Sequence, residues 1–363
     1  MKVKIRINMD NLNDLYSQWL ALQPLSERKK CRLNQRFIVE YNYNSNHIEG
    51  NTLTYGQTEI LLLFGKVNGT GDLKDFVDMK ASLVGMNMMK DEALNHKDTP
   101  LTQNFIRQLH HTILREDYVV YKNLPGGVQT SHTVHAGQYK TRPNSVITRY
   151  GDRFDYASPE ETPSLMADLV NWYNEAEASR EYSAVELAAL FHYRYIRIHP
   201  FEDGNGRIAR LLVNYILARH NWPMIVVRSR KKQEYIGALH QTDVFVGSEP
   251  SAGANASISQ IKYFLKYFKK LVCEELKYNI DFVKEQSPNV WWYDGQKLTF
   301  RSPSTAKMLE AMQTNPGITI EQLAEKGGIV TAAVKKQIRQ MIEKGYIQRD
   351  NDGSWHIFAT ASV

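Results

Sequence analysis

The stretch His199-Pro200-Phe201-Glu202-Asp203-Gly204-Asn205-Gly206-Arg207-Ile208-Ala209-Arg210 predicts a turn that leads into a helix. The proline disfavours helical geometry at the residue before it, and the Gly-Asn-Gly run tolerates positive φ angles. Apolar residues recur at helical spacing after the turn, to about Ala218. A glycine-rich loop that opens a helix directs unpaired backbone N–H groups into one space, so the stretch predicts an anion site.

Four side chains in this stretch have chemistry that suits polyphosphates. Arg207 and Arg210 are three residues apart and therefore reach neighbouring space on one helix face. Asp203 offers the hard oxygen ligands that Mg²⁺ prefers, and His199 is a candidate general base. Taken singly, a histidine before proline is usually a loop residue and Gly-Asn-Gly is usually only a turn. Together these features indicate phosphoryl or nucleotidyl transfer.

The same stretch resembles the signature of the Fic family, His-x-Phe-x-Asp/Glu-Gly-Asn-Gly-Arg-x-x-Arg, and every specified position is matched. The resemblance implies an α-helical enzyme that transfers AMP from ATP to a hydroxyl side chain of a protein. It implies that His199 deprotonates the target hydroxyl and that Asp203 holds Mg²⁺. The implied nucleotide-binding residues are Gly204, Asn205 and Gly206 at the α- and β-phosphates, Arg207 at the phosphates and Arg210 at the γ-phosphate.

Two alternative functions remain beside AMP transfer. Kinase-like Doc relatives carry Lys in place of the second signature glycine, whereas this chain has Gly206, which favours AMP as the transferred group. Transfer of another phosphate-containing group on the same frame is the first alternative. The second is a DNA-binding regulator in which the Fic domain only senses ATP. The intact His199 argues against that second alternative.

The composition is that of an ordinary soluble globular protein, with 42% apolar and 23% charged residues among 363. This length accommodates two or three domains. The net charge of +6 suits anionic ligands, but it is spread over a long chain and is weak evidence for nucleic acid. Cys31 and Cys273 each fall in a predicted helix, so we expect both to be reduced. The sequence has no membrane-length apolar run and no apolar leader, so we expect a soluble, cytoplasmic protein without a membrane partner.

A second motif, Ser45-Asn46-His47-Ile48-Glu49-Gly50, closes a helix predicted over residues 26–48, with Gly50 as its C-terminal stop. Ser45 and Glu49 are four residues apart, so their side chains lie on one face. Ser-x-x-x-Glu-Gly resembles the inhibitory motif of Fic proteins with an N-terminal inhibitory helix, here about residues 26–50. The resemblance implies that Glu49 pairs with Arg210 in place of the γ-phosphate. In the reverse reaction, which removes AMP, the Glu49 carboxylate would orient water. The alternative interpretation is that Glu49 is a solvated carboxylate at a helix end, as an isolated Glu usually is.

The fold is predicted to be mainly α, a Fic-type helical bundle with a β-hairpin flap and a small winged helix-turn-helix domain. The expected parts are an N-terminal helical region over residues 1–100, a Fic catalytic core over 101–286 and the winged helix over 287–363. Helical spacing predicts helices over 10–22, 26–48, 55–65, 72–94, 102–115, 184–197, 228–241 and 260–286, and from Pro163. Residues 248–259 are small and polar and predict a loop.

Residues 125–163 break the helical pattern, beginning at Pro125-Gly126-Gly127, and predict one or two short hairpins. The Fic resemblance identifies residues 137–148 as a flap that pins a target segment by strand addition, with the target hydroxyl facing His199. A surface hairpin without that role is the alternative. By the same resemblance, Tyr235 lies where family members flank the adenine ring, and a packed core position is its alternative.

The C-terminal part begins after Gln286-Ser287-Pro288, which favour a chain break. Helices are predicted over residues 304–313, 320–326 and 331–344, and strands over 345–349 and 355–358. This pattern resembles a winged helix-turn-helix whose third helix reads DNA. Eight Lys and Arg against six Asp and Glu over residues 301–363 give a net charge of only +2. DNA contact and protein binding or dimerisation therefore both stay open.

The expected ligands follow from the resemblance. ATP is the substrate and Mg²⁺ the cofactor, and the acceptor is a Ser, Thr or Tyr hydroxyl of a protein that the flap docks. The chain itself is a further candidate acceptor. A second copy of the chain is a candidate partner, and DNA is a candidate ligand of the winged helix.

Overall fold

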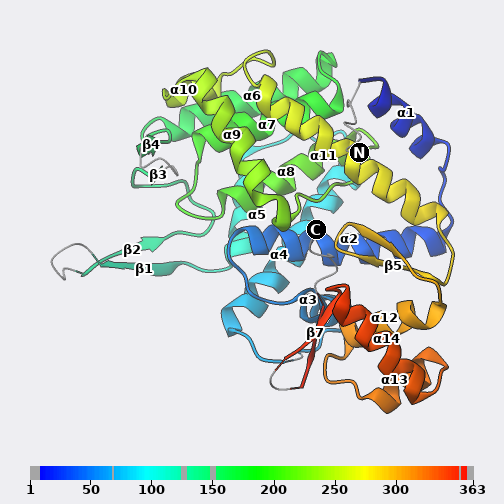
Figure 1. Ribbon diagram of the computed structural model, residues 1–363. Coiled ribbons are helices and arrows are strands. Elements are labelled where there is room, and N and C mark those ends of the chain that lie inside the picture. Colours follow the sequence, from blue (N-terminus) through cyan, green and yellow to red (C-terminus); the bar gives the residue numbers. More distant parts are fainter. Residues whose placement is uncertain (1–8, 68, 124–128, 148–152, 351–352, 358–363) are drawn as a thin grey trace. The chain divides into compact units, whose positions relative to one another are not determined.

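A computed structural model describes residues 9–67, 69–123, 129–147, 153–350 and 353–357 of the chain (Figure 1). Some predicted features lie outside these residues. They are the helix break at Pro125-Gly126-Gly127, the end of the flap at Thr148, the centre of the turn at residues 351–352 and the last strand residue, Phe358.

Two compact units contain these residues. The first includes Asn44–Asn51 and Val77–Cys273, and the second includes Asp14–Tyr43, Thr52–Phe76 and the chain from Glu274 onward. The helix α2 (Glu27–Ile48) contributes residues to both units. The three-part division at residues 1–100, 101–286 and 287–363 stays a prediction.

The first unit is helical, as the apolar spacing of the sequence predicts. Its helices are α4 (Leu73–Asn95), α5 (Gln103–Leu114), α6 (Thr162–Ser179), α7 (Ala184–Ile198), α8 (Asn205–Arg219), the 3₁₀ helix η1 (Ser229–Lys231), α9 (Lys232–Val246), α10 (Pro250–Ala254) and the beginning of α11 (Lys262–Lys284) (Figure 1). Each of the helices predicted in this part of the sequence is present, with ends shifted by a few residues.

The central helix of the first unit is α8. Every residue from Ile208 to Ala218 is buried, so this helix has no solvent-facing side along that length. Leu212 is fully buried, and its truncation to Ala would therefore cost about 2–5 kcal/mol of folding free energy. The signature turn thus leads directly into a buried helix of the unit.

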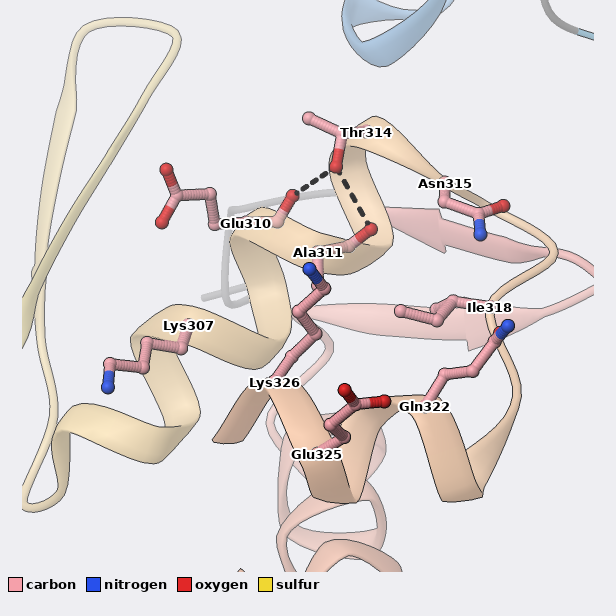
Figure 2. A pocket seen from close by; sticks show the side chains of 9 residues that line it. All are labelled: Lys307, Glu310, Ala311, Thr314, Asn315, Ile318, Gln322, Glu325 and Lys326. Carbon is pink, nitrogen blue, oxygen red and sulfur yellow. Dashed lines mark hydrogen bonds between the residues drawn. The ribbon is translucent and has the colours of Figure 1, made fainter. Parts of the chain in front are cut away.

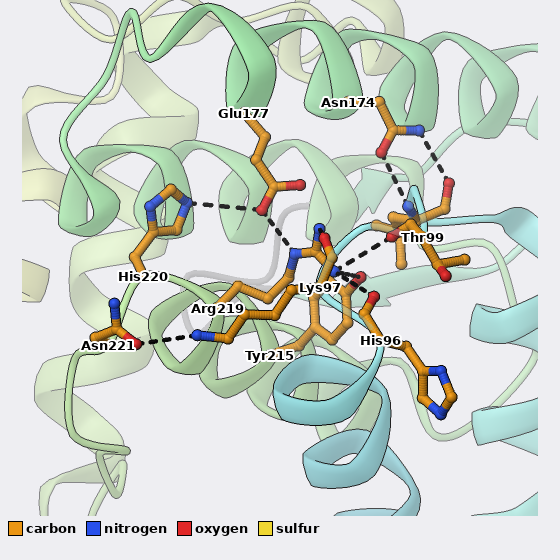
Figure 3. A network of polar contacts seen from close by, with 10 residues as sticks. His96, Lys97, Thr99, Asn174, Glu177, Tyr215, Arg219, His220 and Asn221 are labelled. Atoms are coloured by element: carbon orange, nitrogen blue, oxygen red, sulfur yellow. Dashed lines mark hydrogen bonds and ion pairs between the residues drawn. The ribbon is translucent and has the colours of Figure 1, made fainter.

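The far end of α8 is fastened by Arg219, as Figure 3 shows. Its Nε donates to the Glu177 carboxylate at 2.7 Å, and its Nη1 donates to the carbonyls of His96 and Thr99 at 3.3 and 3.2 Å. The Nη2 group donates to the Lys97 carbonyl. Because this guanidinium is almost fully buried and bonded on several sides, it holds the α4–α5 connection against α8.

The strands of the described residues form antiparallel two-stranded pairs. They are β1 (Tyr118–Asn123) with β2 (Gln129–Val134), β3 (Ser145–Ile147) with β4 (Arg153–Asp155), β5 (Val290–Tyr293) with β6 (Gln296–Thr299), and β7 (Ile347–Arg349) with β8 (Trp355–Ile357). The β1–β2 and β5–β6 hairpins are not among the sequence predictions, although Tyr-Val-Val-Tyr and Val-Trp-Trp-Tyr are favourable strand sequences.

Two segments differ in detail from the sequence predictions. The segment at residues 248–259 contains the helix α10, because a proline stands at its first position and its last residues, Gly253 and Ala254, are buried. Of residues 137–147, the described part of the predicted flap, Ser145–Ile147 is a strand, and its partner β4 lies beyond that range. Residues before the strand form a loop whose bonds to the signature turn are described below.

The second unit contains α3 (Tyr55–Phe64), α12 (Pro303–Thr314), α13 (Ile320–Gly327), α14 (Thr331–Glu343) and the β5–β6 and β7–β8 hairpins, and most of α1 (Met9–Leu20) lies in it. The three helices α12, α13 and α14 and the β7–β8 pair confirm the predicted winged-helix pattern. One apolar core joins them to the unit's other elements, and its members include Val39, Tyr55, Tyr293, Met308, Leu309, Leu323, Val334, Ile338 and Trp355.

A cavity of about 490 Å³ lies between α12 and α13 (Figure 2). Its lining mixes charged and polar side chains with Ile318, with Lys307 and Glu310 on α12 and Glu325 and Lys326 on α13. Elsewhere, Cys31 is exposed and Cys273 is buried, and both are free thiols. None of the helices within the described residues is both long and apolar enough to cross a bilayer.

Candidate active site

His199 ends α7 in a left-handed conformation, with φ 52° and ψ 60°. Its N–H donates to the Tyr195 carbonyl at 2.9 Å, and its ring stacks on Tyr156 with centroids 3.9 Å apart. A left-handed histidine costs on the order of 1 kcal/mol or more, so the surrounding contacts must hold it there. Burial and the nearby Lys140 ammonium lower the pKa of His199 to about 4, so the imidazole is neutral near pH 7.

The loop at residues 140–144 holds the turn around His199. Lys140 is buried, and its ammonium donates to the carbonyls of Ile198 and His199 at 3.0 and 2.9 Å. Its own N–H donates to the Pro200 carbonyl at 2.8 Å. Burial lowers the pKa of Lys140 to about 8. Sequence reasoning missed Lys140 as a site residue, although it lies inside the predicted flap.

Asn144 supports the same turn from the same loop. It accepts a bond from the Lys140 ammonium at 2.9 Å and donates to the Phe201 carbonyl at 2.9 Å. Asn205 grips Phe201 from the other side, since its Oδ1 accepts from the Phe201 N–H at 3.0 Å and its Nδ2 donates to the Phe201 carbonyl at 2.7 Å. The Asn205 side chain is therefore bonded inside the turn. Its backbone N–H is the first N–H of α8.

The two signature glycines meet different steric demands. Gly204 has φ 76°, and a Cβ there would lie 2.9 Å from the Leu114 side chain. Gly206 lies against the Glu49–Arg210 contact, because a Cβ there would lie 2.6 Å from Glu49 Oε1 and 3.0 Å from Arg210 Nη1. Gly204 makes no side-chain cap at the start of α8, so the first N–H groups of this helix, which have no partner inside the helix, are not capped from that position within the described residues.

The carboxylate of Asp203 is bonded on both oxygens. Oδ1 accepts from the Gly204 N–H at 2.6 Å, while Oδ2 accepts from the Tyr118 hydroxyl at 2.6 Å and from Arg207 Nη2 at 3.2 Å. Burial alone would raise the pKa of Asp203, but Arg207, Tyr118 and the Gly204 N–H outweigh it, so the pKa lies below its ordinary value. The group is therefore an ionised carboxylate, nearly half exposed, beside the start of α8.

Arg210 is almost fully buried on α8 and binds Ser45 and Glu49 at the end of α2. Its Nη2 donates to Glu49 Oε1 at 2.6 Å and to the Ser45 carbonyl at 2.9 Å, and its Nε donates to the Ser45 hydroxyl at 3.0 Å. Burial would raise the pKa of Glu49, but Arg210 and then Arg207 more than compensate, so the pKa lies below its ordinary value. The structure thus brings Ser45, Glu49 and Arg210 into one contact.

The end of α2 is anchored on both sides of Glu49. The Asn44 side chain accepts from the Ser229 N–H at 2.7 Å, and Lys232 donates to the Ile48 carbonyl at 2.6 Å. Gly50 follows the helix with φ 99°, a conformation that other residues rarely adopt. These contacts fix the last turn of α2 at η1 and α9, so that Glu49 is presented to Arg210.

Tyr235 is buried on α9 and its hydroxyl lies 2.9 Å from His192 Nε2. Burial, with a smaller contribution from Arg210, lowers the pKa of His192 to about 3, so this imidazole is neutral. The Tyr235 hydroxyl is therefore paired within the core. Its place beside the adenine ring stays a prediction.

Two family models match the sequence. The Fic/DOC family model matches residues 100–217, and the winged helix-turn-helix DNA-binding model matches residues 302–348. The solved structure of a Fic-domain-containing signaling protein from Bacteroides thetaiotaomicron has 51% sequence identity and a TM-score of 0.70. That match covers 76% of this chain and 98% of the Bacteroides chain.

Two more distant relatives extend the comparison. Protein adenylyltransferase fic-1 of Caenorhabditis elegans is 25% identical over 301 residues, which are 83% of this chain. This chain spans only 52% of the length of that relative. A Fic family protein from Desulfovibrio desulfuricans shares the fold over 98% of this chain and 95% of its own, at 18% identity and a TM-score of 0.55.

Proposed function

Because this chain belongs to the Fic/DOC family, we propose that it is a self-inhibited protein adenylyltransferase. In the proposed reaction a hydroxyl oxygen of a protein side chain attacks the α-phosphorus of ATP. A new P–O bond forms, the bond between the α-phosphorus and the α–β bridging oxygen breaks, and pyrophosphate leaves. His199 takes the hydroxyl proton. The observation that carries the proposal is one short turn in which a neutral imidazole, an ionised carboxylate and an uncapped helix start follow one another.

His199 suits the base because its imidazole is unprotonated near pH 7 and its backbone is held by bonds to Tyr195 and Lys140. A positioned base of this kind contributes about two to four orders of magnitude in rate. The free N–H groups at the start of α8 suit the α- and β-phosphates. Arg207 adds a further donor, because its buried Nε has no acceptor among the described residues.

Mg²⁺ fits the donors of this site. Asp203 Oδ1 accepts a single bond from its own turn, so it retains a lone pair for a cation. Mg²⁺ is commonly bound by one or two carboxylates while phosphates and water complete its octahedron. When bound, the ion neutralises charge on the phosphates. Asp203 would hold it, and Tyr118 and Arg207 would orient that carboxylate.

Self-inhibition follows because the Glu49 carboxylate and the γ-phosphate of ATP compete for Arg210. A buried guanidinium pairs strongly with either a carboxylate or a phosphate, because both accept two parallel N–H bonds. While Glu49 occupies Nη2, the γ-phosphate lacks that partner, and ATP binds without the orientation that transfer requires. Since the end of α2 is anchored at Ser229 and Lys232, release of Glu49 requires those contacts to yield as well. The same carboxylate is placed to orient water in the reverse removal of AMP.

The acceptor would dock at residues 137–148 by strand addition, where β3 has a short edge. Its hydroxyl belongs to Ser, Thr or Tyr of another protein or of this chain. Homodimer formation and a cytoplasmic location stay predictions.

The test of this function uses the Glu49→Gly variant with ATP labelled either at the α- or at the γ-phosphate. Proteins of a bacterial lysate serve as acceptors, and mass spectrometry identifies the adduct. We expect label from the α-position and the mass of AMP, and we expect Glu49→Gly/His199→Ala to transfer none. Label from the γ-position would indicate a kinase-like reaction, and no label from either position would contradict a transferase.

Duplex DNA is a second candidate ligand, because α14 exposes Lys335, Lys336, Arg339 and Gln340 on one side of the winged helix. These side chains could reach phosphates and base edges together. We expect a mobility shift of duplex DNA that weakens as salt rises. Binding unchanged in a Lys335→Ala/Lys336→Ala/Arg339→Ala variant would contradict this assignment.

A further inference from the structure

His110 lies on α5 and is fully buried between two loops of the candidate site. Its Nδ1 lies 2.8 Å from the Gly137 nitrogen, and its Nε2 lies 3.0 Å from the Asp203 carbonyl oxygen. Its ring is parallel to the Phe201 ring within 6°, with centroids 3.7 Å apart. One imidazole therefore touches the signature turn twice and the beginning of residues 137–148 once.

The partners fix the tautomer of this ring. The Gly137 backbone nitrogen can only donate, so Nδ1 must be an acceptor and carries no proton. The proton of the neutral ring is then on Nε2, from which it is donated to the Asp203 carbonyl. Both ring nitrogens are thus used, with opposite polarity, toward two different loops.

The Nε2–H bond sets the orientation of one peptide unit. Because the peptide group is planar and trans, fixing the Asp203 carbonyl directs the Gly204 N–H to the opposite side. That N–H donates to Asp203 Oδ1 at 2.6 Å, and therefore points to the side on which the carboxylate lies. Gly204 is also packed against His110, since a Cβ at Gly204 would lie 3.3 Å from its ring atoms. The imidazole thereby fixes the peptide that immediately precedes α8.

The Nδ1 bond holds the other loop. The Gly137 carbonyl accepts from Arg107 Nε at 2.7 Å, and the Gly137 N–H donates to His110. Both backbone polar groups of this glycine are therefore bonded to side chains of α5. Three residues later, Lys140 bonds to the carbonyls of Ile198 and His199. The 137–140 segment is therefore tied to the signature turn at both ends, by His110 at Asp203 and by Lys140 at His199.

We propose that His110 is a positioning residue that orients the peptide before α8 for the nucleotide phosphates and joins this turn to the loop that begins at Gly137. The proposal rests on the proposed function for its effect on ATP. His110 does not touch the reacting atoms. Its effect is expected in the KM for ATP more than in the KM for the protein acceptor, because the peptide that it fixes immediately precedes the N–H groups proposed to bind the phosphates.

Two amide substitutions separate the two bonds. The amide of Gln reaches the position of Nε2, so His110→Gln keeps a donor for the Asp203 carbonyl. The amide of Asn reaches the position of Nδ1, so His110→Asn keeps only an acceptor for Gly137. In the Glu49→Gly background we expect His110→Asn to raise the KM for ATP about tenfold or more, whereas His110→Gln stays within about threefold of the parent. The neighbouring His111 is exposed, and His111→Gln is the matched control, with unchanged constants.

Thermal unfolding and the KM for the acceptor distinguish positioning from a general loss of structure. If Asn and Gln raise the KM for ATP equally, or lower activity only in proportion to a lower Tm, His110 is structural and the proposal is overturned. The same holds if His110→Asn leaves the KM for ATP unchanged.

A readout independent of activity is the ¹⁵N spectrum of the imidazole rings in the full chain, assigned with the His110→Gln variant. We expect His110 as a neutral ring protonated on Nε2, and a ring protonated on Nδ1 overturns the proposal. If Glu49→Gly transfers no AMP at all, the proposed function fails. ATP affinity of the His110 variants, measured by calorimetry, and the ring tautomer then still decide whether His110 positions the turn.

Discussion

Arg210 Nη2 and Glu49 Oε1 lie 2.6 Å apart although 161 residues separate them in the sequence. The guanidinium is almost fully buried, while the carboxylate side chain is 38% exposed. When Glu49 leaves, its carboxylate returns to solvent, and the buried guanidinium keeps its bonds to the neutral groups of Ser45 but lacks a counter-charge, which favours an anionic ligand in that place. This asymmetry is suited to a reversible block in which Glu49 departs and an anionic ligand takes its place.

The first prediction is that Glu49→Gly increases the rate of AMP transfer by about 5- to 150-fold, which corresponds to a coupling free energy of about 1–3 kcal/mol between the Glu49 contact and productive ATP binding. The rate is measured as incorporation of α-labelled ATP into acceptor protein. Glu49→Gln should give a smaller increase, since the neutral amide still fills the space but pairs weakly with Arg210. Equal rates for the wild type and both variants would contradict inhibition by Glu49.

The second prediction concerns pH. Burial and Lys140 lower the pKa of His199 to about 4, and a base works only when it is unprotonated. Activity that depends on His199 is therefore lost as pH falls through about 4, and not through the ordinary histidine value of about 6.5. We expect kcat/KM for ATP in Glu49→Gly to be flat from about pH 5.5 to 7.5.

Glu49 itself raises the pKa of His199 slightly, so its removal shifts the acid limb downward and leaves this window clear. The matched control is the pH dependence of folding, followed by circular dichroism over the same range. A limb centred near pH 6.5 in the activity, with folding unchanged, would show that His199 is solvated and that its described surroundings do not persist in solution.

The third prediction is that Lys140→Met lowers both stability and transfer. The substitution keeps the length of the side chain but leaves the carbonyls of Ile198 and His199 without their buried donor. Each orphaned acceptor costs about 1–3 kcal/mol, and the left-handed His199 loses one of its restraints. Urea unfolding and the transfer rate measure the two effects. Lys80→Met, at an exposed position of α4, is the control and should change neither.

The fourth prediction compares two glycines. Gly204→Ala places a methyl group 2.9 Å from the Leu114 side chain at φ 76°, so we expect it to destabilise the fold by about 1–3 kcal/mol. Gly237→Ala on α9 meets no atom within 4 Å, and alanine is the better helix former, so it should be neutral or stabilising by up to about 1 kcal/mol. Urea unfolding checks both, and equal stability of the two variants would contradict the strain assigned to the turn.

The sequence predicted the parts of the site that are local. The signature turn, the helix after it and the ends of α2 follow from proline, glycine and apolar spacing within a few residues, and the structure has these elements where the spacing indicates. The family signature also singled out Glu49 and Arg210, whose contact no local pattern reveals. The pairing depends on where α2 ends relative to α8, which is a property of the packed unit.

The supporting residues could not be predicted in the same way. Lys140 bonds to a carbonyl 58 residues away, and His110 bonds to one 93 residues away. A bond from a side chain to a distant backbone group leaves no periodic pattern, because every residue offers the same carbonyl. The β1–β2 hairpin was not predicted for a related reason. Its pairing depends on both strands together and not on the sequence of either strand alone.

The most direct measurement is a crystal structure of Glu49→Gly with Mg²⁺ and a non-hydrolysable ATP analogue. We expect phosphate oxygens about 3 Å from the N–H groups at the start of α8, Arg210 on the γ-phosphate, and His199 on the open side of the α-phosphate. Phosphates bound away from the first turn of α8, or an Arg210 that remains turned to Ser45 with no phosphate contact, would contradict this expectation.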